Sequence, residues 1–244
     1  MLVVGGSSEI GAALARAWLR TGTRYFAVTE RSEGRAAELV ADLESGGATV
    51  DAVVLDALRP ESIAAGLEAA WKDGDVDVVV IAIGLLGVQR DVEVDPSLSW
   101  DVLTVNATST IQLALDAARR MEAQQHGTIV LLSSVAGQRG RRDNYVYGAS
   151  KAAVDTFGEG LQQRFAGTEI DVMLVRPGYV VSKMSSGVDP APFAVTVEQS
   201  CERIIRAIAQ RKEVVWVPPV LASLFFLFRL LPRKAWGSIV VRMR

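Results

Sequence analysis

The stretch MLVVGGSSEIGAALARAWLR (1–20) indicates the fold class of this chain most clearly. Residues 1–4 form an apolar run typical of a buried strand, residues 5–11 contain the glycine turn GGSSEIG, and residues 12–20 carry an apolar helical pattern. Glycines let a backbone approach a pyrophosphate, which the free N–H groups at a helix start can hold. This predicts a dinucleotide site, although a turn without a ligand stays open for this stretch alone. The expected cofactor contacts are Gly5, Ser7, Ser8, Glu9, Ile10 and Gly11.

Strand and helix patterns then alternate along the chain. Strands are expected at 25–29, 49–55, 76–83, 128–132, 170–175 and 213–217, and helices at 34–44, 61–71, 99–125, 149–164 and 195–211. The run at 78–83 is apolar at every position, as in central strands of a parallel sheet that is buried on both faces. The sequence predicts an α/β fold with a single doubly wound parallel sheet, Rossmann-like, over residues 1–217, and a short apolar and basic C-terminal extension at 218–244.

The composition narrows the function classes. A chain of 244 residues with 50% hydrophobic and 22% charged residues suits one large α/β domain. The formal charge of -2 and the pI near 5.6 argue against a nucleic-acid partner. Cys201 is the only cysteine and His126 the only histidine, so we expect no metal site and no histidine-dependent triad. No basic and apolar leader precedes the first strand, which predicts a cytoplasmic protein.

The end of the second strand bears on the choice of cofactor. Glu30 can hydrogen-bond both ribose hydroxyls of NAD and repel a 2′-phosphate, whereas Arg31 can bind that phosphate. We expect NADH, because Glu30 holds the strand-end position, and Arg31 leaves NADPH open. Asp56, at the end of the third strand, is interpreted either as an adenine contact or as a helix cap. Gly84 follows the fourth strand, where a side chain would crowd the cofactor.

A second decisive stretch is SVAGQRGRRDNYVYGASK (134–151). Tyr147 lies thirteen residues after Ser134 and four residues, one helical turn, before Lys151. We expect the ammonium to lower the pKa of the phenol, so that Tyr147 exchanges a proton with an oxygen that the Ser134 hydroxyl holds. The pattern indicates carbonyl and alcohol chemistry.

Three further features follow from the order of the chain. Tyr179 and Lys183 repeat the Tyr-Lys spacing, but they follow Pro177-Gly178, which disfavours a helix, so this pair is rejected. We expect Pro177-Gly178 to pass the nicotinamide and residues 182–193 to form a mobile loop over the substrate. Asn106, in an apolar sector, either braces a neighbouring strand or holds a water in a proton path to Lys151.

Together these motifs, in this order over residues 1–183, resemble the short-chain dehydrogenase/reductase family. The resemblance implies that Tyr147 is the general acid/base, that Lys151 lowers its pKa and holds the nicotinamide ribose, that Ser134 polarises the carbonyl, and that Asn106 supports the proton relay. It also implies a homo-oligomer. Glu9 replaces the usual middle glycine of the turn, and residues 82–84 read Ala-Ile-Gly in place of Asn-Ala-Gly.

A narrower resemblance concerns one group within this family, the reductase components of decaprenylphosphoryl-β-D-ribose 2′-epimerase. It is carried by GGSSEIG (5–11), AIGLLG (82–87), NYVYGASKA (144–152), RPGYVVSKM (176–184) and EVVWVPP (213–219). It implies reduction of decaprenylphosphoryl-2-keto-ribose to decaprenylphosphoryl-arabinose in cell-wall arabinan synthesis, with a separate flavoprotein oxidase making the ketone. The alternatives are a reductase of another apolar ketone, of steroid or acyl-chain type, and a nucleotide-binding scaffold without turnover.

Two further features fit a lipid-linked sugar phosphate. Arg139, Arg141 and Arg142 lie between Ser134 and Tyr147, where at least one can reach a substrate phosphate; the alternative is a solvated basic loop. VLASLFFLFRLL (220–231) is too short to span a bilayer, and Arg233, Lys234, Arg242 and Arg244 follow it. We expect this segment either to lie at the inner face of the cell membrane or bind a prenyl chain, or else to pack against another subunit or the core.

Overall fold

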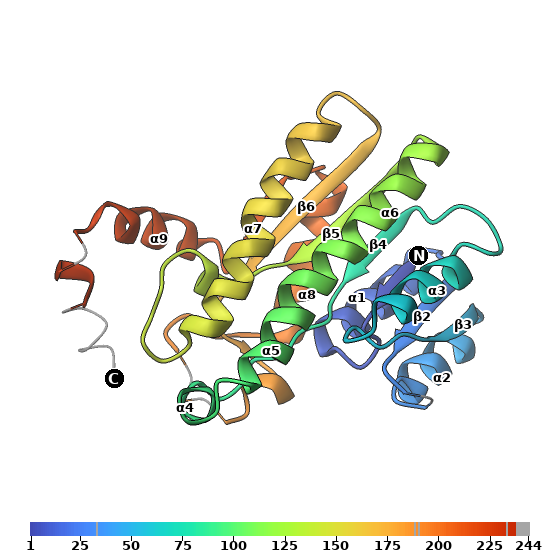
Figure 1. The fold of residues 1–244 in the computed structure, drawn as a ribbon. Coiled ribbons are helices and arrows are strands. Elements are labelled where there is room, and N and C mark those ends of the chain that lie inside the picture. The colour runs from blue at the N-terminus through green and yellow to red at the C-terminus, as the bar shows by residue number, and fades with distance from the viewer. Residues whose placement is uncertain (33, 188, 190, 233, 238–244) are drawn as a thin grey trace.

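A computed structural model of the chain describes residues 1–32, 34–187, 189, 191–232 and 234–237 (Figure 1). Arg233, Arg242 and Arg244 of the expected extension, and two positions of the expected substrate loop, lie outside the described residues.

Seven parallel strands form one sheet in the order β3-β2-β1-β4-β5-β6-β9. Their bounds are β1 Leu2–Val4, β2 Tyr25–Glu30, β3 Thr49–Val54, β4 Val78–Ile81, β5 Gly127–Leu132, β6 Ile170–Pro177 and β9 Val214–Val217. The doubly wound fold is confirmed. Strand order reverses between β1 and β4, and the carboxyl ends of strands beside such a reversal form the usual ligand crevice.

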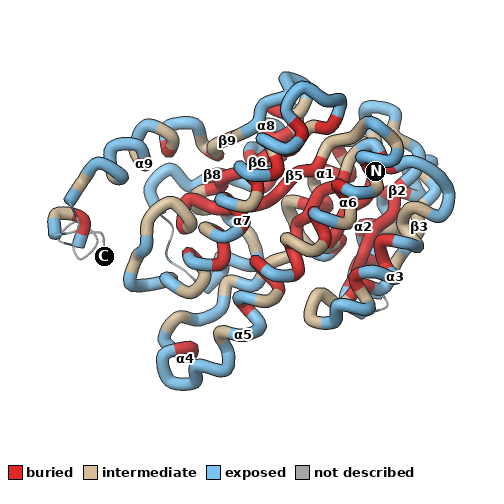
Figure 2. The backbone as a smooth tube through the Cα atoms, turned by 45° about the horizontal axis from the view of Figure 1, so that its top comes forward, coloured by how far each residue is buried: buried red, intermediate tan, exposed pale blue. Residues whose placement is uncertain are grey.

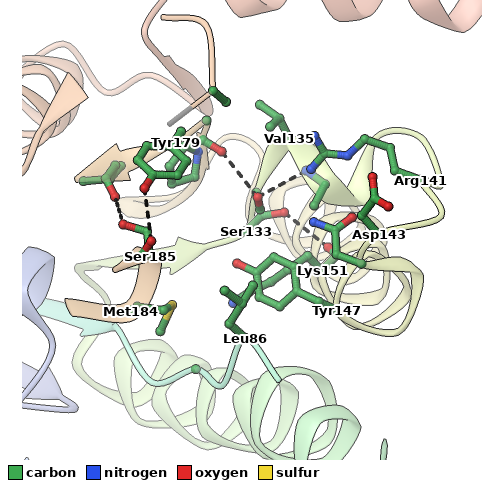
Figure 3. A pocket seen from close by; sticks show the side chains of 18 of the residues that line it. Leu86, Ser133, Val135, Arg141, Asp143, Tyr147, Lys151, Tyr179, Met184 and Ser185 are labelled. Atoms are coloured by element: carbon green, nitrogen blue, oxygen red, sulfur yellow. Dashed lines mark hydrogen bonds between the residues drawn. The ribbon is translucent and has the colours of Figure 1, made fainter. Parts of the chain in front are cut away.

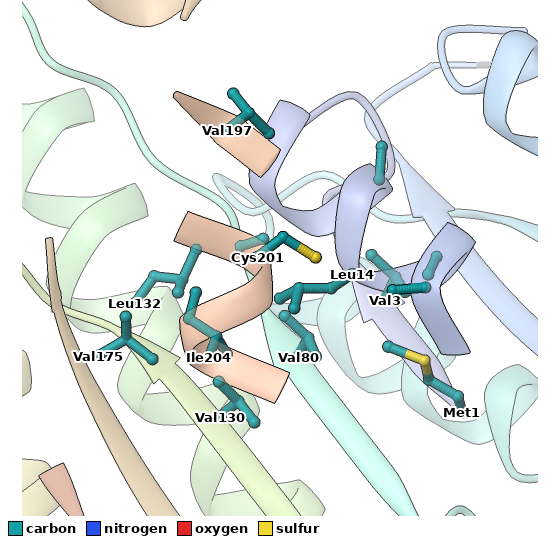
Figure 4. Close-up of a cluster of buried hydrophobic side chains, with 14 of the residues drawn as sticks. Met1, Val3, Leu14, Val80, Val130, Leu132, Val175, Val197, Cys201 and Ile204 are labelled. Atoms are coloured by element: carbon teal, nitrogen blue, oxygen red, sulfur yellow. The ribbon is translucent and has the colours of Figure 1, made fainter. Parts of the chain in front are cut away.

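Helices cover both faces of this sheet (Figure 1). One face packs against α1 Glu9–Arg20, α2 Ala37–Ser45 and α8 Val197–Ala209, and the other against α3 Pro60–Ala70, α6 Thr110–Gln124 and α7 Tyr145–Phe165. Figure 4 shows Leu14 of α1 and Ile204 of α8 packed over Val80 and Val130 of the strands. On β1, Val3 belongs to this cluster while Leu2 and Val4 belong to the opposite one. Successive side chains of a strand point to opposite faces of the sheet, so the apolar residues of β1 pack in both clusters.

Some boundaries differ from the expected ones. Helix α7 begins at Tyr145, four residues before the expected start, and a Cβ on Gly148 would lie 2.8 Å from the Ala136 carbonyl oxygen. The first turn of α7 is thus fixed by close packing on the turn Val135–Gly137. Helix propensity depends on the local sequence alone and does not predict this contact. The expected helix 99–125 is α5 Leu98–Leu103, a π-helical turn Thr104–Ser109 and α6. Helix α4 Gln89–Val94 and the small parallel pair β7 Val180–Val181 and β8 Val195–Thr196 were not predicted.

The chain continues after β9 into α9 Val220–Leu230, which extends beyond the end of the sheet (Figure 1). Leu221 and Phe225 pack with Val135 and Trp216 in a small separate cluster. Figure 2 shows that most of α9 is exposed. None of the helices in the described part of the chain is long and apolar enough to cross a membrane.

Candidate active site

A pocket of about 720 Å³ opens at the carboxyl ends of β4, β5 and β6 (Figure 3). Its walls come from the segment after β4, the end of β5, the start of α7, the loop after β6 and the inner face of α9. The expected residues Ser8, Ile10, Gly84, Ser134, Arg141, Tyr147, Lys151, Pro177 and Gly178 line it. So do the described residues of the 182–193 loop that include Ser182, Met184, Asp189 and Phe193.

Ser134, Tyr147 and Lys151 are brought together in this pocket. Ser134 lies two residues after the end of β5; its Oγ accepts a hydrogen bond from the Ala136 N–H at 3.2 Å and donates a long one, 3.4 Å, to the Pro177 carbonyl. Tyr147 and Lys151 lie one turn apart on α7, with the Lys151 Nζ 5.8 Å from the centroid of the phenol ring. A carbonyl between the Ser134 and Tyr147 hydroxyls would meet two hydrogen-bond donors.

The expected pKa of Tyr147 is corrected by the structure. Burial raises the pKa of this phenol, and the Ser134 hydroxyl and the Arg141 charge oppose only part of that rise. The Lys151 ammonium instead donates to the Leu132 carbonyl oxygen at 2.8 Å, and burial lowers the pKa of Lys151 to about 8. Tyr147 is therefore a protonated phenol at neutral pH, the form that donates a proton.

Asn106 lies fully buried in the π-helical turn. Its Oδ1 accepts from the Leu85 N–H and its Nδ2 donates to the Leu85 carbonyl, both at 2.7 Å, and Nδ2 also lies 3.1 Å from the Ser150 Oγ. The amide is thus used to brace the segment after β4 against α7. The expected bracing role is met at the segment that follows β4, and the expected water in a proton path to Lys151 stays a prediction. π-Helical turns are often found at functional sites.

The glycine turn fits a dinucleotide phosphate. Gly5 adopts a left-handed conformation at φ 95°, and a Cβ on Gly6 would lie 2.3 Å from the Val28 side chain. Ser8 caps α1, with its Oγ 3.4 Å from the Gly11 N–H. The helix start therefore faces the pocket with its partial positive charge. Glu9, expected among the cofactor contacts, instead accepts a 2.5 Å hydrogen bond from the Lys183 N–H and ties α1 to the loop after β7.

Glu30 is already engaged at the end of β2. Its carboxylate is buried and accepts from the Gly34 N–H at 2.9 Å and the Ala36 N–H at 2.6 Å. The side chain of Arg31 is 61% exposed and lies 3.9 Å from Asp56, whose Oδ1 accepts from the Leu58 N–H. Asp56 therefore closes a local turn and is not the helix cap, since the N-cap of α3 is Arg59. Glu30 gives no preference for NADH, because the Gly34 and Ala36 amides hold its carboxylate.

The three loop arginines have different roles, and two expectations among them are wrong. Arg139 donates to the Phe228 and Leu231 carbonyls and lies 5.0 Å over the Trp236 ring, so it fastens α9. Arg142 is exposed and lies 3.6 Å from Asp143. Only Arg141 lines the pocket; its Nε is buried and lacks a hydrogen-bond partner among the described residues. Burial lowers the pKa of Arg141, and Asp143 and Tyr147 act in the opposite direction.

A buried ionic group behind the pocket was missed. Arg176 of β6 donates to both carboxylate oxygens of Asp155 at 2.9 and 2.7 Å, and to Glu159 at 2.8 Å. Gln138 donates to the same Asp155 at 2.5 Å, which joins the arginine-containing loop to α7 and β6. Two features of the sequence could have indicated this group: Arg176 stands at the end of an apolar strand, and Asp155 lies two helical turns after Tyr147.

The sheet order, the glycine turn and the Ser134, Tyr147 and Lys151 group define a dinucleotide-dependent oxidoreductase. The profile of the short chain dehydrogenase family matches residues 1–215, and the chain belongs to this family. It is an NAD(P)-dependent oxidoreductase.

Three known proteins illustrate the similarity. An uncharacterized oxidoreductase of Mycobacterium tuberculosis is 36% identical over 242 residues, which cover 97% of this chain and 95% of that protein. The 3-oxoacyl-[acyl-carrier-protein] reductase of Escherichia coli is 29% identical over 191 residues, 75% of this chain and 74% of that one. The structure of a short-chain dehydrogenase from Sphingobium yanoikuyae in complex with NADPH superposes with a TM-score of 0.83 at 24% identity and covers 100% of this chain and 95% of that one.

Proposed function

We propose that this protein is an NAD(P)H-dependent ketoreductase whose substrate joins a keto sugar, a phosphate and a long apolar chain. The specific proposal is reduction of decaprenylphosphoryl-2-keto-ribose to decaprenylphosphoryl-arabinose, in cell-wall arabinan synthesis. A flavoprotein oxidase would supply the ketone. The motif resemblance at residues 5–11, 82–87, 144–152, 176–184 and 213–219 supports this choice of substrate.

The observation that carries the proposal is Arg141 in a pocket that has one apolar wall. Leu221, Leu224, Phe225 and Phe228 of α9 line one wall and offer an apolar surface for a hydrocarbon chain. The guanidinium of Arg141 provides a charge close to Tyr147, with a buried Nε that has no partner among the described residues. An anionic group next to the reacting carbon would satisfy that N–H, because a buried donor without a partner is unfavourable.

The chemistry follows from the positions of the hydroxyls. When bound, the reduced nicotinamide supplies a hydride to the carbonyl carbon. The Ser134 hydroxyl holds the carbonyl oxygen and the Tyr147 phenol donates its proton as negative charge develops there. Lys151, positively charged below its pKa of about 8, lies beside the phenol and the β5 end.

The proposal is tested by replacing Arg141 and, as a matched control in the same loop, Arg142. We expect Arg141→Met to lower kcat/KM for a polyprenylphosphoryl 2-keto-pentose by roughly 10- to 150-fold, the loss of one or two charge-assisted hydrogen bonds. Arg142→Met should match the wild type, because Arg142 is exposed and outside the pocket. Equal losses for the two variants would contradict the role of Arg141.

A second candidate is reduction of a ketoacyl chain. It is favoured by the Escherichia coli relative, a 3-oxoacyl-[acyl-carrier-protein] reductase, and by the apolar α9 wall. An uncharged ketone of matched chain length separates the two. If it is reduced as efficiently as the phosphorylated sugar, and Arg141→Met leaves both rates unchanged, the ketoacyl type is supported instead.

NADH and NADPH should be compared in the same assay. The Glu30 carboxylate is held by the Gly34 and Ala36 amides and gives no preference, whereas the exposed Arg31 favours NADPH. Arg31→Gln raises the KM for NADPH alone if Arg31 binds the 2′-phosphate.

A further inference from the structure

We propose that α9 docks on the surface of an anionic lipid bilayer. Phe226, Leu227 and Leu230 would insert at the boundary between the lipid headgroups and the acyl chains, and the positive charge of this segment would attract the lipid phosphates. The docking does not depend on the proposed substrate.

The helix presents two apolar faces with different environments. Leu221 and Phe225 are 5% exposed and, with Leu224 and Phe228, face the pocket. On the opposite side, Phe226 is 65%, Leu227 59% and Leu230 68% exposed. Three large apolar side chains on one turn and a half of helix form a contiguous patch, and such patches mark interaction sites. The pocket explains the inner face, while the outer face is left for another partner.

The charge of the segment identifies that partner. After Glu213 the sequence contains no acidic residue, but it contains five basic ones: Arg229, Arg233, Lys234, Arg242 and Arg244. The preceding part of the chain keeps 21 basic and 28 acidic residues, a formal charge of -7. An apolar face on a segment of net positive charge is the combination that binds anionic bilayers at the interface.

A second copy of the chain fits this face less well. In a symmetric dimer the same patch would face itself, which would bring two segments of like positive charge together. Anionic headgroups supply opposite charge instead.

The helix is also held in place, as a docking element requires. Arg139 donates to the Phe228 and Leu231 carbonyls, and the Trp236 indole N–H donates to the Gly140 carbonyl at 2.8 Å. The outer face is therefore presented by a fixed helix. Because the inner face lines the pocket, a chain held in the bilayer would reach the site along α9; this consequence, unlike the docking, rests on the proposed function.

Vesicle sedimentation tests the docking with the full chain. The vesicles consist of phosphatidylcholine alone or of phosphatidylcholine with phosphatidylglycerol, and contain no substrate. The test variant is Phe226→Ser/Leu230→Ser, outside the pocket lining. The control is Tyr25→Ser, an aromatic residue that is 72% exposed at the start of β2. Thermal unfolding and NADPH binding confirm that the variants are folded.

We expect the wild type and Tyr25→Ser to sediment with the anionic vesicles, and less so at high salt. The double variant should partition at least about tenfold more weakly, since two large apolar side chains no longer leave water. Wild-type protein that stays in solution with anionic vesicles overturns the proposal. A double variant that sediments like the wild type also contradicts the proposal. The same holds if the wild type is a dimer and the double substitution converts it to monomers without changing vesicle binding.

Discussion

Replacing Lys151 with methionine should change stability in a way that depends on pH. Lys151 is 4% exposed, and its Nζ donates a hydrogen bond to the Leu132 carbonyl oxygen. Burial disfavours the charged form and lowers the pKa from the ordinary 10.5 to about 8. Methionine has a similar length and carries no charge, so it removes this cost.

The size of the effect follows from the two pKa values. The unfolded chain binds the proton more tightly, so the folded wild type carries a cost below its pKa that disappears as the pH rises toward 10.5. The cost is about 3 kcal/mol at pH 7 and about 1.4 kcal/mol at pH 9.5. The unpaired Leu132 carbonyl costs the variant about 1–3 kcal/mol at either pH. Between pH 7 and pH 9.5, the free energy of unfolding of the wild type should therefore rise by about 2 kcal/mol relative to that of Lys151→Met.

Urea unfolding of the cofactor-free proteins at both pH values measures this difference. Lys212→Met, at an exposed lysine, serves as the control and should differ from wild type equally at the two pH values. If the free-energy difference between wild type and Lys151→Met is the same at pH 7 and pH 9.5, or moves the other way, the ammonium of Lys151 is not buried as described.

Two further substitutions test the packing around the site. Gly148→Ala should destabilise by about 1–3 kcal/mol and slow turnover, because the new Cβ would lie 2.8 Å from the Ala136 carbonyl oxygen; Gly160→Ala in the same helix, with no atom within 4 Å, should stabilise by about 0.5–1 kcal/mol, and urea midpoints compare them. Arg139→Lys should speed chymotrypsin cleavage within α9 roughly tenfold, since lysine lacks the two separate guanidinium nitrogens that each reach one carbonyl; an unchanged cleavage rate would show that Arg139 does not fasten the helix.

The fold could be predicted because its signals are local. The apolar run of β1 indicates a strand that is buried on both faces of the sheet. The glycines of the first turn indicate a backbone conformation and a close approach that residues with a side chain do not tolerate. The spacing of four residues likewise places Tyr147 and Lys151 on the same face of the helix, wherever the helix begins.

The parts that were wrong depend on contacts between distant segments. Nothing near Arg139 in the sequence shows that α9, almost ninety residues later, supplies its carbonyl partners. Glu30 was expected to face a ribose, but the Gly34 and Ala36 amides occupy its carboxylate. The pKa of Tyr147 depended on where the Lys151 ammonium points, and a spacing of four residues does not determine this.

The proposed ketoreductase activity is tested most directly by measuring nicotinamide absorbance over time. The assay contains a decaprenylphosphoryl 2-keto-pentose, with NADH or NADPH in parallel. The wild type should oxidise at least one cofactor. Tyr147→Phe should bind that cofactor equally well and lose about 10²- to 10⁴-fold in rate, because the proton donor is gone. A Tyr147→Phe variant that oxidises the cofactor at the wild-type rate would contradict the assignment of the pocket as a Tyr147-dependent ketoreductase site.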